Sequence, residues 1–256
     1  MIIDALLRRP NPKQIPIIES KAKRKVIRAG RRGGKTVVAA LIAIKAFLAG
    51  RRILYGTPTQ EQVDTFWFEV KRALGDLIDK GIFVKNETLH SIELPGTKQR
   101  IRAKTCWNAD TLRGDYCDLL ILDEYQLMNE EAWEVVGAPM LLDNNGDAIF
   151  IYTPPSLHSR SVSKARDPRH AAKLYKAAEA KMLSAQNEGR PPRWEVFHFT
   201  SLDNPVLSKD ALDEIASDMS AISYRQEILA EDMDEIPGAL WTHSLLDRTR
   251  ALLIRI

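Results

Sequence analysis

Cysteine and histidine are scarce in this sequence. Its 256 residues include two cysteines, Cys106 and Cys117, which ten intervening residues separate. They form neither a disulfide framework nor a CxxC metal-binding pair, and a reducing, cytosolic setting is the simplest interpretation. The five histidines show no HExxH motif and no close pairing, which argues against a zinc enzyme.

Long apolar runs are also absent. The longest, residues 37–44, ends at Lys45 after eight residues, whereas a transmembrane helix needs about 20. The N-terminus carries Arg8 and Arg9 without a long apolar region behind them, so it does not have the pattern of a secretory signal. We also find no internal repeat and no low-complexity segment. These absences leave a globular protein without a membrane segment.

What is present is an ordinary globular composition, with 45% hydrophobic and 28% charged residues. At about 100–200 residues per domain, the length fits one large domain or one domain with a small appendage.

The net charge of +3 is unevenly distributed. Residues 1–35 carry eleven basic and two acidic side chains, and residues 160–193 carry nine basic and three acidic ones. Residues 203–235 have the opposite balance, with two basic and ten acidic side chains. A basic face suits phosphates and an acidic segment suits a basic partner; solvated helix faces are the alternative, and for residues 160–193 the two interpretations are evenly balanced.

The order of the expected elements predicts an α/β fold with a mainly parallel sheet flanked by helices. Strands are expected over 25–29, 52–56, 117–123, 148–153 and 194–199, and a hairpin around residues 95–97. Helices are expected over 35–49, from a Thr59–Gln62 capping box to about 80, from a cap at Asn129 to about 136, from beyond Pro168 to about 186, and over about 207–230. We expect a core over residues 1–200 and a smaller, mostly helical region over 201–256.

The strongest motif is AGRRGGKT at residues 29–36, which follows an expected strand and begins an expected helix. Its glycines let backbone N–H groups surround phosphate oxygens beside the positive end of the helix dipole; they are Gly30, Gly33 and Gly34. Lys35 would reach the β- and γ-phosphates of a nucleotide, and the Thr36 hydroxyl would bind Mg²⁺. The pattern departs from GxxxxGK[ST], because Ala29 stands where glycine is required and Gly30 comes one position late. A glycine turn that only caps a helix is the alternative.

The second motif is LLILDE at residues 119–124, an apolar strand that ends in two acids. Asp123 would hold Mg²⁺, directly or through water. Glu124 would orient and deprotonate an attacking water. Two acids at a strand end are common, but these follow the Gly-Lys-Thr loop by about 90 residues, and the two halves explain each other. Together they predict the site of a nucleotide hydrolase.

Three arginines are candidates for stabilising charge on the γ-phosphoryl group. Arg31 and Arg32 lie inside the loop and would act within their own chain. Arg113 precedes Gly114, which suggests an exposed turn from which it would reach a neighbour's nucleotide in a ring. A surface salt bridge with Asp110 or Asp115 is the alternative for Arg113, and spacing alone favours it.

Two further residues have possible nucleotide roles. Thr153 ends the strand that follows the Asp-Glu strand, and there it could sense the γ-phosphate; a polar strand terminus is an equal alternative. Gln14 lies upstream of the first strand, where its amide could read the adenine edge. A solvent-facing glutamine is the more common outcome.

These residues together resemble the N-terminal ATPase domain of the large terminase subunit of tailed bacteriophages. The resemblance is carried by AGRRGGKT at 29–36, GTPTQ at 56–60, LRG at 112–114, LDE at 122–124, YTP at 152–154 and DNP at 203–205. The motifs lie in family order and cover most of residues 11–235. An arginine four places before the loop lysine is a family habit, so Gly30's late position is ordinary for this group.

The resemblance implies a RecA-like ATPase core, a lid region, and a motor that uses ATP and Mg²⁺ to pump double-stranded DNA into a procapsid. It implies Arg31 as an in-cis arginine, Arg113 as a finger onto the neighbour, Thr153 within the coupling motif, and Gln14 as an adenine contact. It also implies portal protein and small terminase subunit as partners, a ring often of five subunits, and a place in the host cytoplasm and transiently at the portal vertex. The family's C-terminal nuclease domain would begin near residue 256, so we expect an excised ATPase domain with a linker.

Two other functions fit parts of the sequence. A helicase-type nucleic-acid ATPase shares the phosphate loop and the Asp-Glu strand, but it usually needs a second motor lobe, for which residues after 200 leave no room. A DNA-binding or portal-docking module with an inactive nucleotide site would not need Lys35, Thr36, Asp123 and Glu124, which are all intact.

Overall fold

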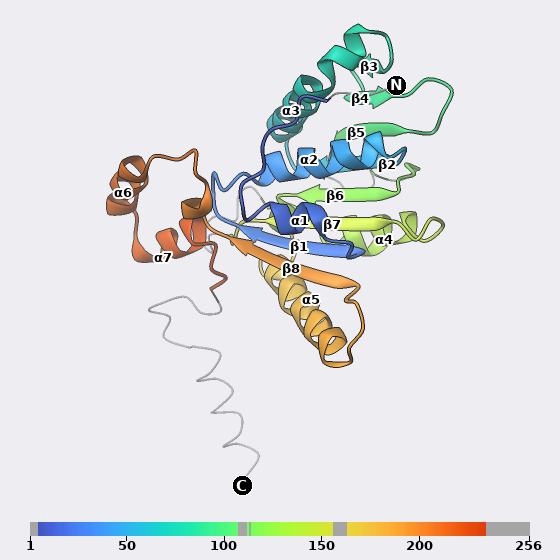
Figure 1. The fold of residues 1–256 in the computed structure, drawn as a ribbon. Helices are drawn as coiled ribbons and strands as arrows, with labels where there is room; N and C mark the ends of the chain where they lie inside the picture. The colour runs from blue at the N-terminus through green and yellow to red at the C-terminus, as the bar shows by residue number, and fades with distance from the viewer. Residues whose placement is uncertain (1–4, 107–111, 113, 156–162, 234–256) are drawn as a thin grey trace.

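The computed structural model describes residues 5–106, 112, 114–155 and 163–233. An eight-stranded sheet forms its centre, in the order β3-β4-β5-β2-β6-β7-β1-β8 (Figure 1). Six strands are parallel, and β3 and β4 form an antiparallel hairpin at one edge. The strands are β1 (Arg24–Ala29), β2 (Arg52–Thr57), β3 (Val84–Asn86), β4 (Ser91–Glu93), β5 (Arg100–Thr105), β6 (Leu119–Asp123), β7 (Asp147–Tyr152) and β8 (Trp194–Phe199). The predicted α/β class is confirmed.

Helices cover both faces of the sheet (Figure 1). One apolar layer is formed with α1 (Ile15–Glu19), α2 (Lys35–Leu48) and α3 (Gln60–Asp79). The other is formed with η2 (Tyr125–Leu127), η3 (Ala132–Gly137) leading into α4 (Ala138–Met140), and α5 (His170–Asn187). Within the described residues, no helix is long and apolar enough to cross a membrane.

The apolar patterns explain which elements are central. All five residues of β6 are buried, as expected for a parallel strand covered on both faces. Ten of the 14 residues of α2 are buried, so this helix lies within the core rather than on it. Gly50, at φ +86°, takes the left-handed conformation that ends the helix. A buried Leu or Ile side chain contributes about 1.5–3 kcal/mol, so α2 is firmly anchored behind the loop that precedes it.

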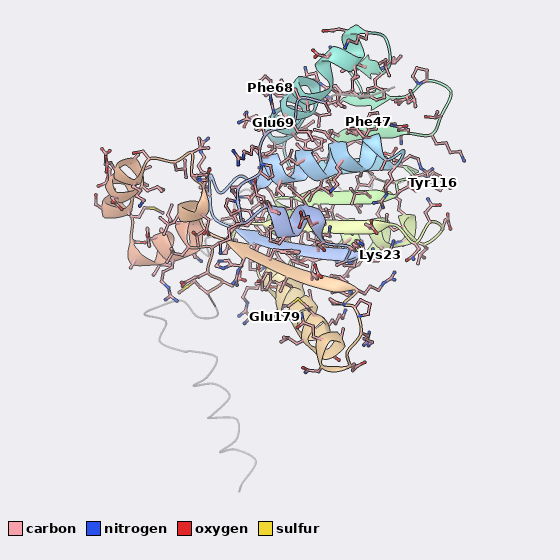
Figure 2. The ribbon with its side chains drawn as sticks, viewed as in Figure 1. Lys23, Phe47, Phe68, Glu69, Tyr116 and Glu179 are labelled. Carbon is pink, nitrogen blue, oxygen red and sulfur yellow. The ribbon has the colours of Figure 1, made fainter. Side chains whose placement is uncertain are left out.

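The outer side of α3 carries the N-terminal segment of the chain. On α3, Phe66 is fully buried while Phe68, labelled in Figure 2, is 59% exposed, so this helix has one inner and one outer side. Glu69 pairs with Arg8 at 2.7 Å, and Leu6 donates its N–H to the Ala73 carbonyl. The segment is thereby brought back toward the start of α2.

Two predicted helices differ from those observed. The run over about 207–230 breaks into α6 (Lys209–Asp218), α7 (Ala221–Ser223) and η5 (Tyr224–Ile228). The break arises because Met219 is extended and Ser220 starts a new helix, accepting the Ser223 N–H at 3.1 Å. The helix expected after Asn129 is a π-helical turn, η3, although Asn129 does accept the Glu131 N–H. The short α1 was not predicted.

Beyond β8 the chain forms a separate group of helices at the carboxyl end of the parallel strands (Figure 1). We call residues 207–223 the lid helices and residues 224–232 the lid base. The division of the chain at residue 200 stays a prediction, and residues 234–256 of the predicted linker lie outside the described residues.

Candidate active site

The predicted phosphate loop connects β1 to α2 as expected. Arg32 at φ +57° and Gly34 at φ +92° are both left-handed, and Gly34 directly precedes the first residue of α2. Backbone turns of this kind, in which left-handed residues alternate with others, direct N–H groups into an anion-binding concavity. The loop and the N-terminus of α2 therefore form a candidate phosphate cradle.

The late glycine has a packing reason. Gly30 donates its N–H to the Phe199 carbonyl of β8 at 3.0 Å. A Cβ atom at this position would meet the backbone carbonyl oxygen of Ile228 and would lie 2.7 Å from the backbone nitrogen of Ser201. Glycine is thus needed at 30 because the lid base and the end of β8 both pack against the loop at this point.

The loop lysine joins the two halves of the predicted site. Lys35 is buried, and its Nζ donates to Thr153 Oγ1 at 2.5 Å and lies 3.5 Å from Glu124 Oε1. These residues follow β1, β7 and β6, which are neighbours in the sheet, so their carboxyl ends meet at one edge. The structure therefore brings together Lys35, Glu124 and Thr153.

Asp123 is held by two hydrogen bonds at the buried end of β6. Tyr55 donates its hydroxyl to Oδ2 at 2.8 Å, and the Glu124 N–H donates to Oδ1 at 2.9 Å. Burial, followed by the neighbouring Glu124 charge, raises the pKa of Asp123 to about 6. The Tyr55 ring stacks on Phe66, with ring centroids 3.7 Å apart. Asp123 is thus fixed in orientation, and burial disfavours its charged form.

Glu124 has a left-handed backbone at φ +54° and ψ +41°. A non-glycine residue in this conformation carries strain, which is often found at functional sites. Its Oε2 accepts from Gln126 Nε2 at 2.7 Å while its Oε1 faces Lys35. The backbone turn therefore directs the carboxylate toward the phosphate loop instead of along the strand.

The donor set fits a magnesium ion that also binds nucleotide phosphates. In the described part of the chain, no group of three or more His, Cys, Asp or Glu side chains could hold a metal ion. Mg²⁺ typically uses one or two carboxylates together with substrate phosphates, so this does not exclude it. Asp123 and Glu124 are adjacent carboxylates at the end of β6, and a cation bound there would offset their charge.

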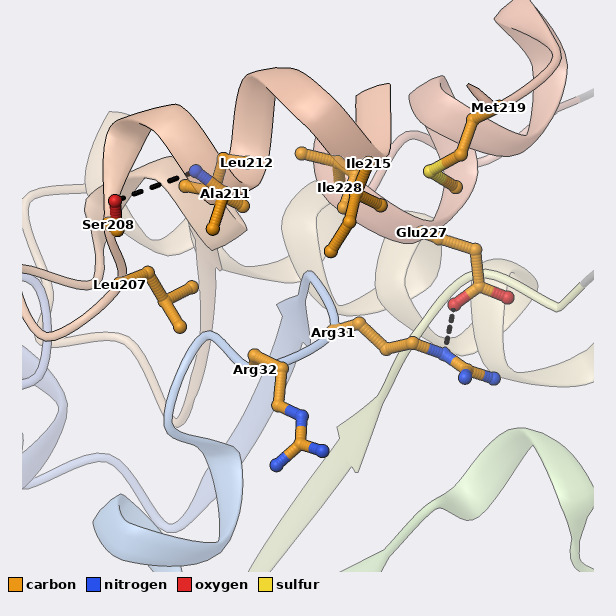
Figure 3. Close-up of a pocket in the computed structure, with 10 residues that line it drawn as sticks. All are labelled: Arg31, Arg32, Leu207, Ser208, Ala211, Leu212, Ile215, Met219, Glu227 and Ile228. Atoms are coloured by element: carbon orange, nitrogen blue, oxygen red, sulfur yellow. Dashed lines mark hydrogen bonds and ion pairs between the residues drawn. The ribbon is translucent and has the colours of Figure 1, made fainter. Parts of the chain in front are cut away.

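The Arg31 side chain reaches Glu227 of the lid base, whereas the Arg32 side chain extends away from α6 (Figure 3). Arg31 Nε pairs with Glu227 Oε2 at 2.7 Å, while the Arg31 side chain is 73% exposed. The Arg31 N–H also donates to the Glu227 carbonyl at 2.7 Å. Arg31 and Arg32 line a cavity of about 490 Å³ whose other wall is the apolar side of α6, with Leu212 and Ile215. Arg31 is thus bound to the lid base at one wall of this cavity.

Gln14 lies against the loop and not in solvent. Its buried side chain accepts the Asn11 N–H at 3.0 Å and donates to the Gly34 carbonyl at 3.1 Å. A second cavity, of about 630 Å³, lies beside it. The lining of this cavity includes Arg8, Gln14, Gly34, Val37, Asn204 and Val206. The structure thus places Gln14 against the phosphate loop, at the wall of this cavity.

Arg113 lies outside the described residues, as does Asp110. The other residue proposed to pair with Arg113, Asp115, is bound by three side chains of β5. These are Arg100 at 3.4 Å, Arg102 at 3.2 Å and Lys104 at 2.8 Å. Asp115 therefore already has cationic partners of its own.

Sequence reasoning missed the residues that support this site from a distance. Tyr55 orients Asp123, Gln126 orients Glu124, and Glu227 holds Arg31. Asn204 donates to the Arg32 carbonyl at 2.6 Å. Only Asn204 lay within a quoted motif, the DNP at 203–205. The others had no local signal.

No family model matches the chain. Two curated sequences do, both named as large subunits of terminase, from Thermus virus P23-45 and Thermus phage G20c. Each is 28% identical over 170 residues, which cover 59% of this chain and 35% of the relative. The resemblance is to large terminase subunits. The chain spans about a third of the length of these relatives.

Solved structures confirm the fold that the resemblance predicts. The large terminase ATPase domain of Thermus phage P74-26 has a TM-score of 0.68 at 24% identity, covering 88% of this chain and 94% of that one. The HK97 bacteriophage large terminase has a TM-score of 0.61 at 16% identity, covering 88% of this chain and 51% of that one. The large terminase of a thermophilic bacteriophage, solved in complex with ADP, has a TM-score of 0.59 at 16% identity, covering 86% of this chain and 53% of that one. The predicted terminase-like ATPase fold is therefore confirmed.

Proposed function

We propose that this chain is the ATPase part of a DNA-packaging motor, which hydrolyses ATP to move double-stranded viral DNA into a procapsid. The observation that carries the proposal is the cluster of Lys35, Glu124 and Thr153 beside the phosphate loop, with Asp123 oriented next to it. The similarity to large terminase subunits supports the role as a motor and DNA as the molecule that it moves. The nucleotide complex of the thermophilic bacteriophage terminase supports ATP as the ligand.

Hydrolysis is an in-line attack of water on the γ-phosphoryl group. Glu124 positions this water and takes its proton, while Lys35 and Arg31 neutralise charge that develops on the phosphoryl oxygens. Without nucleotide, Lys35 is bound to Thr153 and Glu124. An arriving phosphate would draw Lys35 away and leave Glu124 free to bind water.

The remaining loop residues bind the rest of the nucleotide. Backbone N–H groups of the loop, including those of Arg32 and Gly34, would cradle its phosphates. The Gly30 N–H is bound to the Phe199 carbonyl and the Gly33 N–H to the Gly30 carbonyl, so these two glycines would shape the loop around the phosphates. Mg²⁺, held by the Thr36 hydroxyl and Asp123, would offset the charge of the β- and γ-phosphate oxygens. Gln14 would contact the adenine from the cavity that it lines, using the amide N–H that Gly34 leaves free.

The proposal extends to assembly. Arg113 acts as a finger in a neighbouring chain's site, within a ring of about five subunits as the resemblance implies. Portal protein, small terminase subunit and double-stranded DNA are the partners, in the host cytoplasm and transiently at the portal vertex. Thr153 couples hydrolysis to movement, residues 1–200 form the core, and residues 201–256 form the lid and linker. Contact with DNA would be to its phosphates and strongly salt-dependent.

Replacing Glu124 tests the chemistry. Glu124→Ala should abolish ATP turnover, while the affinity for a fluorescent ATP analogue stays within a few-fold, since Lys35 and the loop remain. Glu134→Ala is a matched control, because Glu134 is an exposed glutamate on η3. Near-normal turnover by Glu124→Ala would remove Glu124 from its role.

Mixing two inactive variants tests the finger. Arg113→Ala and Glu124→Ala should each be nearly inactive alone, and together should regain turnover if Arg113 of one chain completes another chain's site. No recovery at concentrations where wild-type chains are active would show that Arg113 does not act between chains.

A further inference from the structure

A buried acidic side chain connects the lid base to the core. Asp232 ends the lid base, and its side chain is only 6% exposed. Its Oδ2 accepts two hydrogen bonds, from Arg28 Nη1 at 2.9 Å and from the Tyr152 hydroxyl at 2.7 Å. One carboxylate oxygen therefore joins three segments that are far apart in sequence.

Both partners of Asp232 are next to the nucleotide site. Arg28 is the second-last residue of β1, just before the phosphate loop begins. Tyr152 ends β7 and immediately precedes Thr153, which accepts the Lys35 hydrogen bond. The lid base also holds the other side of Thr153, since Gln226 Nε2 donates to the Pro155 carbonyl at 3.0 Å. The lid base therefore binds the chain on both sides of Thr153, at Tyr152 and at Pro155.

The network is poorly suited to stabilising the fold. Asp232 Oδ1 and Arg28 Nε are both buried, and neither has a hydrogen-bond partner within the described residues. A buried ion pair with unsatisfied atoms recovers little of its desolvation cost. Its geometry, by contrast, is specific, since Tyr152 is fully buried and Arg28 also lies 4.5 Å from the Tyr175 ring centroid. Burial raises the pKa of Tyr152, so its hydroxyl remains a donor at physiological pH.

We infer that Asp232 is a positioning residue that latches the lid base to the segment around Thr153, so that the position of Thr153 sets the position of the lid. This inference rests on the proposed function in one respect, because it treats Thr153 as the residue that responds to bound nucleotide. The latch itself is a property of the nucleotide-free chain. Asp232 would act through Tyr152 and Arg28 and would not touch the nucleotide.

The distance between lid and core tests the latch directly. Spin labels at Asp79→Cys, on the exposed end of α3, and Asp213→Cys, on α6, would report this distance by pulsed electron resonance. The native thiols of Cys106 and Cys117 are buried and their pKa values are raised by burial to about 12, so they should not be labelled in the folded protein. The measurement needs neither ATP nor DNA.

Tyr152→Phe and Asp232→Asn should each broaden the distance distribution of the nucleotide-free protein, and the double variant should broaden it no further than either alone. Tyr175→Phe is the matched control, because it removes a hydroxyl from the same neighbourhood for which no hydrogen bond is found among the described residues. Distributions in both variants that match the control would overturn the latch. Tyr152→Phe removes a single oxygen atom, so it decides the question if Asp232→Asn fails to fold.

Nucleotide binding separates this inference from the proposed function. The latch predicts that Tyr152→Phe binds a fluorescent ATP analogue within about twofold of wild type, whereas the nucleotide-induced change in lid distance is reduced. An unreduced change in Tyr152→Phe would contradict the latch. If the wild-type chain binds no nucleotide at all, the proposed function fails, and the nucleotide-free distances still decide whether the latch exists.

Discussion

Replacing the buried Asp123 carboxylate with the isosteric Asn amide should stabilise the protein at neutral pH and abolish its ATP turnover. The Asn oxygen can still accept the Glu124 N–H, and its NH₂ group can donate to the Tyr55 hydroxyl, which turns to accept. The substitution therefore keeps both hydrogen bonds of Asp123 and removes only its charge.

The size of the effect follows from the pKa of Asp123. Burial and the Glu124 charge raise it to about 6, against about 3.9 in an unfolded chain. The folded state binds the Asp123 proton more tightly than the unfolded chain does. The resulting contribution to the free energy of unfolding is therefore complete below about pH 4 and is lost as pH rises through about 6. Two pH units correspond to about 3 kcal/mol, or roughly 6–12 °C in melting temperature for a domain of this size.

Thermal melts in a chelator, without nucleotide, would measure this. Asp123→Asn should melt above wild type at pH 7.5, and the difference should disappear near pH 4. Asp79→Asn is the matched control, because Asp79 is an exposed carboxylate at the end of α3, and it should change little at either pH. If Asp123→Asn is less stable than wild type at pH 7.5, or if the difference does not depend on pH, the claim that the buried Asp123 charge destabilises the folded protein is wrong.

Three further changes have definite expected outcomes. Gly30→Ala should weaken binding of a fluorescent ATP analogue at least tenfold, because a Cβ there meets backbone atoms of Ser201 and Ile228; Gly75→Ala, with open space around it, should not. Cys106 and Cys117 should react with a thiol reagent at pH 8 only after unfolding in urea, since burial raises both pKa values to about 12; rapid reaction of the folded chain would contradict their burial. Ser220→Ala should lower the free energy of unfolding of the lid helices by about 1 kcal/mol through loss of a helix cap, measured by hydrogen exchange; unchanged exchange in α7 would argue against the cap.

Sequence reasoning predicted what is local. The strand, glycine loop and helix over 25–49 could be predicted because their signals lie within a few residues of one another, and the same holds for the strand that ends at Asp123 and Glu124. The 194–199 strand was predicted with its observed bounds. The break at Met219 was missed because an apolar-polar period continued across it, while Ser220 capped a new helix.

The contacts between the lid base and the core could not be predicted from the sequence. Glu227 meets Arg31 and Asp232 meets Arg28 across about 200 residues of chain, and no periodicity or motif relates such positions. The need for glycine at 30, one place later than the general pattern, has the same origin. It follows from the backbone of Ile228, which only the folded structure places beside the loop.

The most direct test of the central claim is phosphate release from ATP by the purified chain, measured against chain concentration in the presence of Mg²⁺. We predict turnover that depends on Lys35 and Glu124 and whose rate per chain rises with concentration, because a neighbour completes each site. Firm ATP binding without phosphate release at any concentration, with or without double-stranded DNA, would contradict the claim that this chain is the ATPase of a packaging motor.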